Sequence, residues 1–240
     1  MSPRIRATLL LLPLLSGPVA KARAAQAPPD SSVYHLDPGS RLVVKTGKAG
    51  LFGFAGHTHV IRARGVAGTL VYRPGTPASS LRLEVATDSL EVLTPPDTAE
   101  IRKVTQAMRD EVLHVSKYPE MTFAADSVDA RPGKVALRLA ITMHGTTRQV
   151  PVSADVTIAA DLIRARGSFV VKQTDFGIKP YKGGPAGTVK VADPVTFCFD
   201  LLAIPGPAGA PGKRPRPGTE DFTTVPGCVD RYTPPPARPM

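Results

Sequence analysis

The chain has 240 residues, among them 30 Lys and Arg, 20 Asp and Glu, two Cys and no Trp, and its formal net charge is +10. Without the first 24 residues, which hold four basic side chains and no acid, the charge falls to +6. This charge is scattered, with no Lys/Arg run and no interleaved aromatics, which argues against nucleic-acid binding. It is compatible with a weak attraction to an anionic membrane surface.

The N-terminal segment has the order of features found in a secretory signal peptide. Two arginines precede an apolar stretch over residues 7–15, and small residues follow. The apolar stretch is much shorter than the roughly 20 residues that a membrane-spanning helix needs. We therefore predict a signal peptide over residues 1–24, cleaved after Ala24 or Ala25. Because no cysteine lies near that site, we expect a periplasmic or secreted protein rather than a lipoprotein.

The middle of the chain is dominated by apolar residues at every second position, which is the period of a β-strand. Such runs lie near residues 41–46, 57–63, 66–73, 80–89, 121–128, 134–143, 148–159, 162–173 and 194–202. Mostly Arg, Thr, Ser, Asp and Lys occupy the alternate positions, so each strand has one dry and one wet face. Short links such as 131–134 and 145–147 predict hairpins. Eight or nine antiparallel strands can bury one apolar face each by closing into a barrel, and a two-sheet sandwich is the alternative.

One segment has the period of a helix instead. Between Asp97 and about Val115 the apolar residues recur at spacings of three and four, which predicts an amphipathic helix inserted between two strands. Asp97 and Glu100 can form a reciprocal N-terminal cap, and Pro119 ends the segment. We expect this helix to close one side or one end of the barrel.

The domain limits follow from composition. Residues 33–203 are expected to form one globular domain. Residues 204–240 hold ten prolines and few large apolar side chains, so we predict a disordered, Pro-rich tail. Cys198 lies in the last predicted strand and Cys228 in this tail. In an oxidising compartment the two can form a disulfide, and the alternative is one buried and one free thiol.

Four motifs stand in order along the predicted domain: YHLDPGS at 34–40, KYPEMTF at 117–123, LAITMHGTTRQV at 139–150 and QTDFGI at 173–178. Together they resemble the YceI-like family of periplasmic polyisoprenoid-binding proteins. The resemblance implies a lipocalin-like, eight-stranded antiparallel barrel whose tubular interior holds the tail of a polyprenyl lipid or quinone, with no chemistry performed on it. A barrel of eight strands is just wide enough for a slender ligand.

The predicted ligand-binding residues are large apolar side chains of the inward strand faces, the helix and the loops. They are Phe52, Phe54, Leu83, Val85, Met108, Phe123, Leu137, Leu139, Ile141, Phe169, Phe176, Phe197 and Phe199. Phe52 and Phe54 lie in a glycine-rich segment that forms either an apolar lid over the barrel mouth or a turn whose rings plug the core. Each buried methylene contributes roughly 0.8 kcal/mol, so a long apolar ligand needs few polar contacts.

A second hypothesis rests on His57 and His59, which point the same way in a strand and could ligate one metal ion. A metal-binding protein or metal-dependent hydrolase needs a third ligand, which His114 or His144 supplies if the fold brings it close. The alternative is a polar barrel rim with local hydrogen bonds. The sequence has no recognisable nucleophile with its base and no carboxylate pair. We therefore expect a lipid carrier that is not an enzyme and has no cofactor; exposed strand edges would allow a homodimer.

Overall fold

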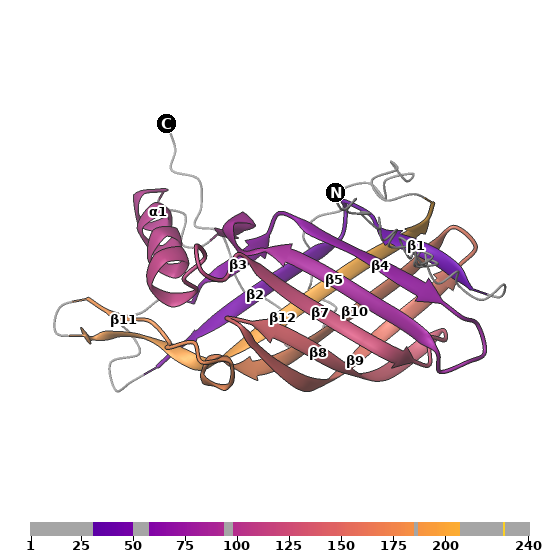
Figure 1. Ribbon diagram of the computed structural model, residues 1–240. Helices are drawn as coiled ribbons and strands as arrows, with labels where there is room; N and C mark the ends of the chain where they lie inside the picture. The colour runs from indigo at the N-terminus through magenta and orange to yellow at the C-terminus, as the bar shows by residue number, and fades with distance from the viewer. Residues whose placement is uncertain (1–30, 50–57, 94–97, 185–186, 207–227, 229–240) are drawn as a thin grey trace, which may run out of the picture.

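The computed structural model describes residues 31–49, 58–93, 98–184, 187–206 and 228. These residues form one antiparallel sheet system and a single α-helix (Figure 1). The strands are β1 (Ser32–Leu36), β2 (Arg41–Lys48), β3 (Val60–Ala63), β4 (Val66–Tyr72), β5 (Ser79–Ala86), β6 (Leu90–Val92), β7 (Glu120–Val128), β8 (Gly133–Met143), β9 (Thr146–Ala159), β10 (Leu162–Lys172), β11 (Lys182–Gly183) and β12 (Val189–Pro205). All nine predicted strand runs are present, and β1, β6 and β11 are additional.

The sheet closes into a barrel. Its order is β1-β4-β5-β7-β8-β9-β10-β12, and β12 pairs with β1 to complete the circle, with Tyr34 opposite Pro205. The closed, eight-stranded antiparallel barrel predicted from the sequence is thus confirmed, and the sandwich alternative is wrong. Closure leaves no free edge along the body of the sheet, which removes a site of unwanted strand pairing.

Three of the eight strands are broken near one end of the barrel. There β2, β3 and β6 continue the pairing from β12, as extensions of β1, β4 and β5 beyond short irregular segments. The next strand, β7, begins at Glu120 opposite Ala86 and does not reach β6. Figure 1 shows α1 at this end of the barrel, above β3 and on the same side as β11.

The helical segment is shorter than predicted. Helix α1 covers Thr98–Ala107, and a π-helical turn, η3, follows over Met108–Val112. The predicted end near Val115 is wrong because His114 takes the left-handed conformation, with φ of 47°, and turns the chain toward β7. Asp97, the predicted cap, lies outside the described residues. A π-turn is a rare feature that often marks a functional position in a helix.

The inward strand faces form the core. The main cluster extends through the barrel from beneath the helix, and a second cluster, with Tyr34, Ile163 and Ala203, lies at the opposite end. A two-residue turn at His144 and Gly145 joins β8 to β9, and both residues have positive φ (51° and 72°). Such a turn matches the twist of the flanking strands. Along most strands, buried apolar side chains alternate with more exposed polar ones, as the sequence predicts.

Strand β12 departs from that pattern because its outer face is also buried. Cys198, Asp200 and Leu202 point outward yet are at most 6% exposed. Cys228 covers Cys198, and Arg164 forms a two-pronged ion pair with Asp200, with N–O distances of 2.7 and 2.6 Å. The prediction of one wet face per strand is wrong here, because Cys228 from outside the sheet and Arg164 of the neighbouring strand β10 cover it.

Candidate functional site

A cavity of about 570 Å³ lies at the end of the barrel where the strands are broken. We call it the chamber. Helix α1 and η3 form its roof, β2, β3 and β6 form one side, and β10, β12 and the link around β11 form the other. Its wall is mainly apolar and includes Val44, Ile61, Leu90, Val92, Val104, Met108, Val112, Leu113, Met121, Met143, Val171, Ile178, Val189, Val191, Val195 and Phe197. A volume of this size is typical of sites for small organic ligands.

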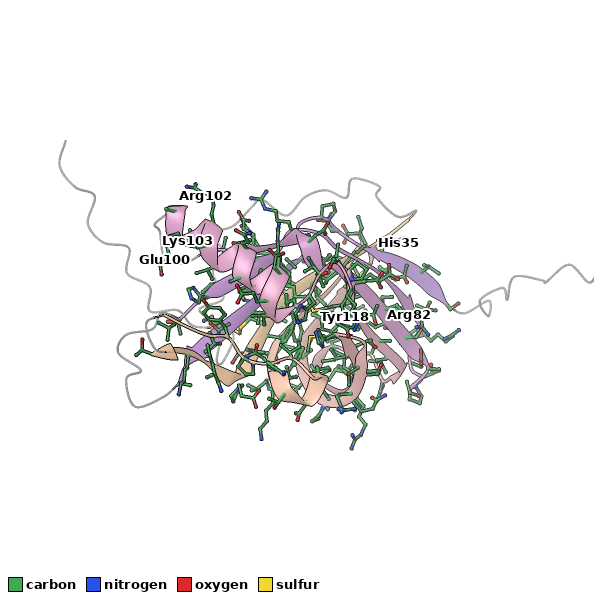
Figure 2. The ribbon with its side chains drawn as sticks, turned by 60° about the vertical axis from the view of Figure 1, so that its left-hand side comes forward. His35, Arg82, Glu100, Arg102, Lys103 and Tyr118 are labelled. Atoms are coloured by element: carbon green, nitrogen blue, oxygen red, sulfur yellow. A yellow bond between two sulfur atoms is a disulfide. The ribbon has the colours of Figure 1, made fainter. Side chains whose placement is uncertain are left out.

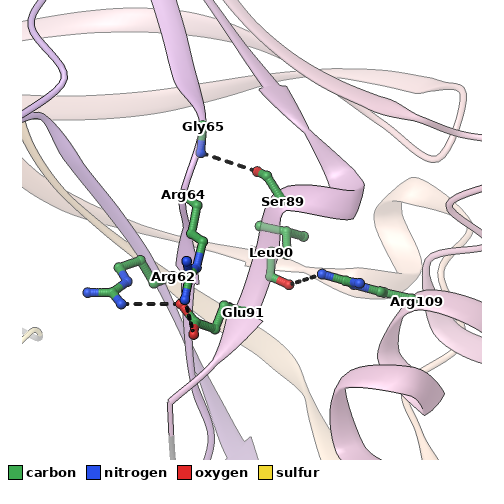
Figure 3. A network of polar contacts seen from close by, with 7 residues as sticks. All are labelled: Arg62, Arg64, Gly65, Ser89, Leu90, Glu91 and Arg109. Carbon is green, nitrogen blue, oxygen red and sulfur yellow. Dashed lines mark hydrogen bonds and ion pairs between the residues drawn. The ribbon is translucent and has the colours of Figure 1, made fainter. Parts of the chain in front are cut away.

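On the side of β6 away from β3, no strand among the described residues continues the barrel wall, and the chamber opens there. Arg109 of η3 reaches this edge and donates a hydrogen bond to the backbone carbonyl of Leu90 (Figure 3) and another to that of Asp88, just before the strand. The Arg109 side chain thus supplies hydrogen-bond donors to backbone carbonyls that a neighbouring strand would otherwise pair. Backbone carbonyls shielded from water require such partners. Arg109 thereby attaches the roof of the chamber to its wall.

The wall beside this contact is held by an ion-pair network on its outer surface (Figure 3). Glu91 of β6 accepts two hydrogen bonds from Arg64, of 2.7 and 2.6 Å, and one of 3.2 Å from Arg62 of β3. The hydrogen bond from Arg64 lowers the pKa of the Glu91 carboxyl to about 2, with Arg62 adding to the effect and burial opposing it. The network ties β3 to β6, two of the short strands that make the chamber wall.

Polar groups gather at the rim. His59, Glu100, Lys103, Tyr181 and Lys190 line the chamber from four different elements or their links. They are only partly buried or exposed, whereas the deep wall is apolar. The arrangement therefore suits a ligand with an apolar body and a polar end.

Two further polar residues of the wall are engaged with the backbone. Thr46 accepts a hydrogen bond of 3.1 Å from the His59 amide, and Gln173 donates to the carbonyl of Ala192. Next to this contact, burial is the largest single influence on the pKa of the Asp193 carboxyl and raises it, but hydrogen bonds from Thr174 and Gln173 and the charge of Lys172 together outweigh burial and lower the pKa. The bonds from Gln173 and Thr174 hold the irregular start of β12 against the 3-10 turn that follows β10.

The predicted ligand-binding residues divide into two groups. Met108 and Phe197 lie on the chamber wall. The others that the structure describes belong to the core around and below the chamber: Leu83, Val85, Phe123, Leu137, Leu139, Ile141, Phe169, Phe176 and Phe199. Phe52 and Phe54 lie outside the described residues. These side chains fill the lumen themselves, so they do not form a tubular interior that is open along the whole barrel.

Most residues of the wall were not predicted from the sequence. Met121, Met143, Val171 and Val195 are inward positions near the strand ends. They lie one alternation closer to α1 than the predicted residues Phe123, Ile141, Phe169 and Phe197. The period-two pattern contained them, but it carries no information on where a lumen is filled and where it is open. Leu90 and Val92 belong to β6, which was not predicted as a separate strand.

The metal hypothesis is not supported. His59 lies on the chamber wall, while His57 lies outside the described residues. The fold brings His114 and His144 to each other, with ring centroids 5.6 Å apart. Burial lowers the pKa of His144, and the nearby His114 and Lys117 lower it further, against a hydrogen bond with the Phe176 backbone. In the part of the chain that the structure describes, no group of three His, Cys, Asp or Glu residues could hold a metal ion.

The two cysteines form a disulfide, which decides between the alternatives left open by the sequence. Cys198 and Cys228 are both buried, in a small cluster with Val43 on the outer face of β2 and β12. The Lys45 ammonium group donates a hydrogen bond to the Cys228 carbonyl. The disulfide thus fixes residue 228 to the outer surface of β2 and β12, two neighbouring strands whose inner faces contribute to the chamber wall.

The fold and the chamber define a lipocalin-like β-barrel protein with an apolar cavity at one end. A model of the YceI-like domain matches residues 34–203, and the chain belongs to this family. The comparison with curated protein sequences finds no match. Among the described residues, no helix has the length and apolar character needed to cross a membrane.

Two solved structures share the fold at low sequence identity. BcnA of Burkholderia cenocepacia superposes with a TM-score of 0.55 at 17% identity, over 70% of this chain and 98% of that chain. A polyisoprenoid binding domain from Saccharophagus degradans, implicated in plant cell wall breakdown, superposes with a TM-score of 0.51 at 15% identity, over 72% of this chain and 98% of that chain. Both likenesses show that this chain shares the fold of these proteins.

Proposed function

We propose that the protein is a periplasmic or secreted carrier that binds an isoprenoid, a quinone or a similar apolar lipid in the chamber and performs no chemistry on it. The observation that carries the proposal is the chamber itself, about 570 Å³ of mainly apolar space inside a closed barrel. The polyisoprenoid binding domain that shares the fold supports the choice of ligand class.

The affinity would come from burial of apolar surface. Each methylene that leaves water contributes roughly 0.8 kcal/mol, so a chain of several methylenes needs little polar recognition. Met108, Met121 and Met143 on the wall are unbranched and polarizable, which lets them adapt to ligands of different shape. The rim groups, such as His59, Tyr181 and Lys190, would face the polar end of the ligand.

The disulfide supports the proposed location. Disulfides persist in the periplasm and outside the cell and are rare in the reducing cytoplasm. A bond between Cys198 and Cys228 therefore suits a protein that is exported. The predicted signal peptide agrees with this location, although its residues lie outside the described part of the chain.

A weak contact with anionic membranes completes the proposal. Lys103 and Lys190 line the chamber, and Lys182 lies directly opposite Lys190 on the neighbouring strand β11. Figure 2 shows Lys103 and Arg102 on the same part of α1, near Glu100. Each such basic group near an anionic bilayer contributes about 1 kcal/mol of attraction. The mouth of the chamber would therefore face the lipid surface from which the ligand is taken.

The deciding experiment is native mass spectrometry of the exported mature protein, followed by denaturing release of whatever it carries. The proposal expects a stoichiometric isoprenoid or quinone. If no lipid is released, and if added polyprenyl compounds do not raise the melting temperature, the carrier proposal fails, because a ligand that binds only the folded state must stabilise it.

A further inference from the structure

A layer of aromatic rings closes the lumen directly under the chamber. Phe197 of β12 and Phe169 of β10 are cross-strand partners, and their rings stack with centroids 5.0 Å apart at an interplanar angle of 4°. Phe123 of β7 meets Phe197 edge to face, with centroids 6.0 Å apart. We call these three residues the floor; they are at most 8% exposed.

The floor spans the whole width of the barrel. In the order of the closed sheet, β7 and β12 lie on opposite sides, four strands apart in either direction. A ring from β7 that touches a ring from β12 must therefore cross the middle of the lumen. At this level the stacked and edge-to-face rings occupy the middle of the lumen.

The chamber ends at this layer. Its wall includes Met121, Met143, Val171 and Val195, the next inward positions toward α1 on β7, β8, β10 and β12. On these same strands the floor level holds Phe123, Ile141, Phe169 and Phe197, of which only Phe197 borders the cavity. The boundary between open and filled lumen thus falls between two successive inward positions.

The interior below the floor is also filled. Phe199, the next inward residue of β12, lies against Gly167, where a Cβ atom would come within 2.7 Å of the Phe199 ring. A larger residue at position 167 would collide with the ring and with the Ser153 backbone, so the glycine is what makes room for Phe199. The far end is closed by the cluster around Tyr34 and Tyr72, whose rings are 6.3 Å apart.

We propose that the floor sets an upper limit on ligand length, so that the protein selects short isoprenoid chains over long polyprenyl chains. This inference rests on the carrier function proposed above and adds the chain length to it. A ligand enters at the helix end, extends to Phe197 and gains nothing from further isoprene units, which stay in water. Phe197 is then the residue that determines specificity, because it is the part of the floor that the chain meets.

The test compares chain lengths in one mixture. Purified protein, freed of lipid, is mixed with equal amounts of three isoprenols in one mild detergent. These are farnesol, the shortest, geranylgeraniol, and solanesol, the longest. Bound species are counted by native mass spectrometry. The ratio of two bound isoprenols is then compared between the wild type and each variant. Because the mixture is the same, differences in aqueous solubility cancel. For the wild type we expect binding to stop improving between farnesol and solanesol.

Three variants separate the floor from a general loss of packing. Phe197→Ala opens the floor and should raise the ratio of solanesol to geranylgeraniol at least about tenfold, since each additional buried methylene is worth roughly fourfold in affinity. Leu201→Ala truncates a buried inward residue of the same strand below the floor, and should leave the ratio unchanged. Val195→Phe adds a ring above the floor and should shift binding toward farnesol.

The outcomes are distinct. If wild-type binding keeps improving up to solanesol, or if Phe197→Ala folds and keeps the wild-type length profile, the length limit is overturned while the carrier function stands. If the wild type binds none of the three isoprenols, the carrier function itself fails. Thermal melting identifies a variant that does not fold, and in that case the wild-type profile and Val195→Phe decide.

Discussion

The two halves of the barrel interior are lined by the same kinds of residue and yet are packed differently. Below the floor, side chains fill the lumen, and Ala125, Leu139 and Phe199 are at most 6% exposed. Above it, the wall side chains are equally apolar but face the chamber. The difference comes from the strands, because three of them break at the upper end and β7 starts too late to pair with β6. A cavity here reflects missing strand pairing rather than a change in composition.

This comparison predicts that truncating a side chain lowers the free energy of unfolding more in the filled part of the barrel than on the chamber wall. Phe123→Ala, in the floor, should lower the free energy of unfolding by about 3–5 kcal/mol, because it leaves a void that neighbours on several strands cannot fill. Val104→Ala, on the chamber wall, should cost about 1 kcal/mol or less, because this half-buried side chain already borders open space. Urea unfolding followed by far-ultraviolet circular dichroism measures both. Equal costs would contradict the distinction between a filled body and an open end.

The disulfide should stabilise the chamber side of the barrel from outside. Replacing Cys198 and Cys228 together by alanine frees a link between residues 30 positions apart and should lower the free energy of unfolding by roughly 3 kcal/mol. Urea unfolding under non-reducing conditions gives the value. Reductant should lower the urea midpoint of the wild type toward that of the double variant and leave the midpoint of the variant unchanged. Identical midpoints for the two proteins without reductant would refute a stabilising role of the disulfide.

Arg109 should control the attachment of the roof. Arg109→Met keeps the apolar stem but loses the hydrogen bonds to the carbonyls of Asp88 and Leu90, at an expected cost of about 1–2 kcal/mol. Hydrogen exchange should accelerate in residues 98–112 and stay unchanged in β8 to β10. Arg102→Met, an exposed position on the same helix, serves as the control and should leave exchange as it is. Unchanged exchange in both variants would show that packing alone holds the roof.

Glu91 should make the chamber wall sensitive to acid. Its pKa in the folded protein is about 2, below the ordinary value of 4.5, so its stabilisation is complete above about pH 4.5 and is lost as the pH falls toward 2. Glu91→Gln should remove this pH dependence, which amounts to about 1 kcal/mol because the pair with Arg64 is partly screened by water. Unfolding in urea across this pH range measures it.

A matched control is available for that experiment. Asp126 pairs with Arg82 at 3.4 Å, and both side chains are largely exposed, 76% and 67%. Asp126→Asn should therefore change stability little at any pH in the range. If the two variants behave alike, the network of Glu91, Arg62 and Arg64 does not hold β3 to β6 more firmly than a surface pair would.

The class of fold can be predicted from the sequence alone. Alternation of apolar and polar residues in nine runs, with short links, predicted antiparallel strands, and the strand number and dry faces predicted closure into a barrel. The inserted helix was also predicted, although its end was not, because the left-handed turn at His114 and the π-turn before it have no clear sequence signal. The strand and helix periods are local features of the chain, so the spacing of apolar residues can reveal them.

The position of the open end of the barrel depends on contacts that the sequence pattern does not show. Phe123 and Val195 both occupy inward positions of predicted strands, and nothing in the alternation shows that one belongs to the floor and the other to the chamber wall. That distinction depends on which strands lie opposite each other and on where each strand begins and ends in space. The same is true of the disulfide, since the sequence left the pairing of Cys198 with Cys228 open until the fold brought them together. Contacts between residues distant in the chain depend on sheet closure, and a periodicity of two residues does not encode them.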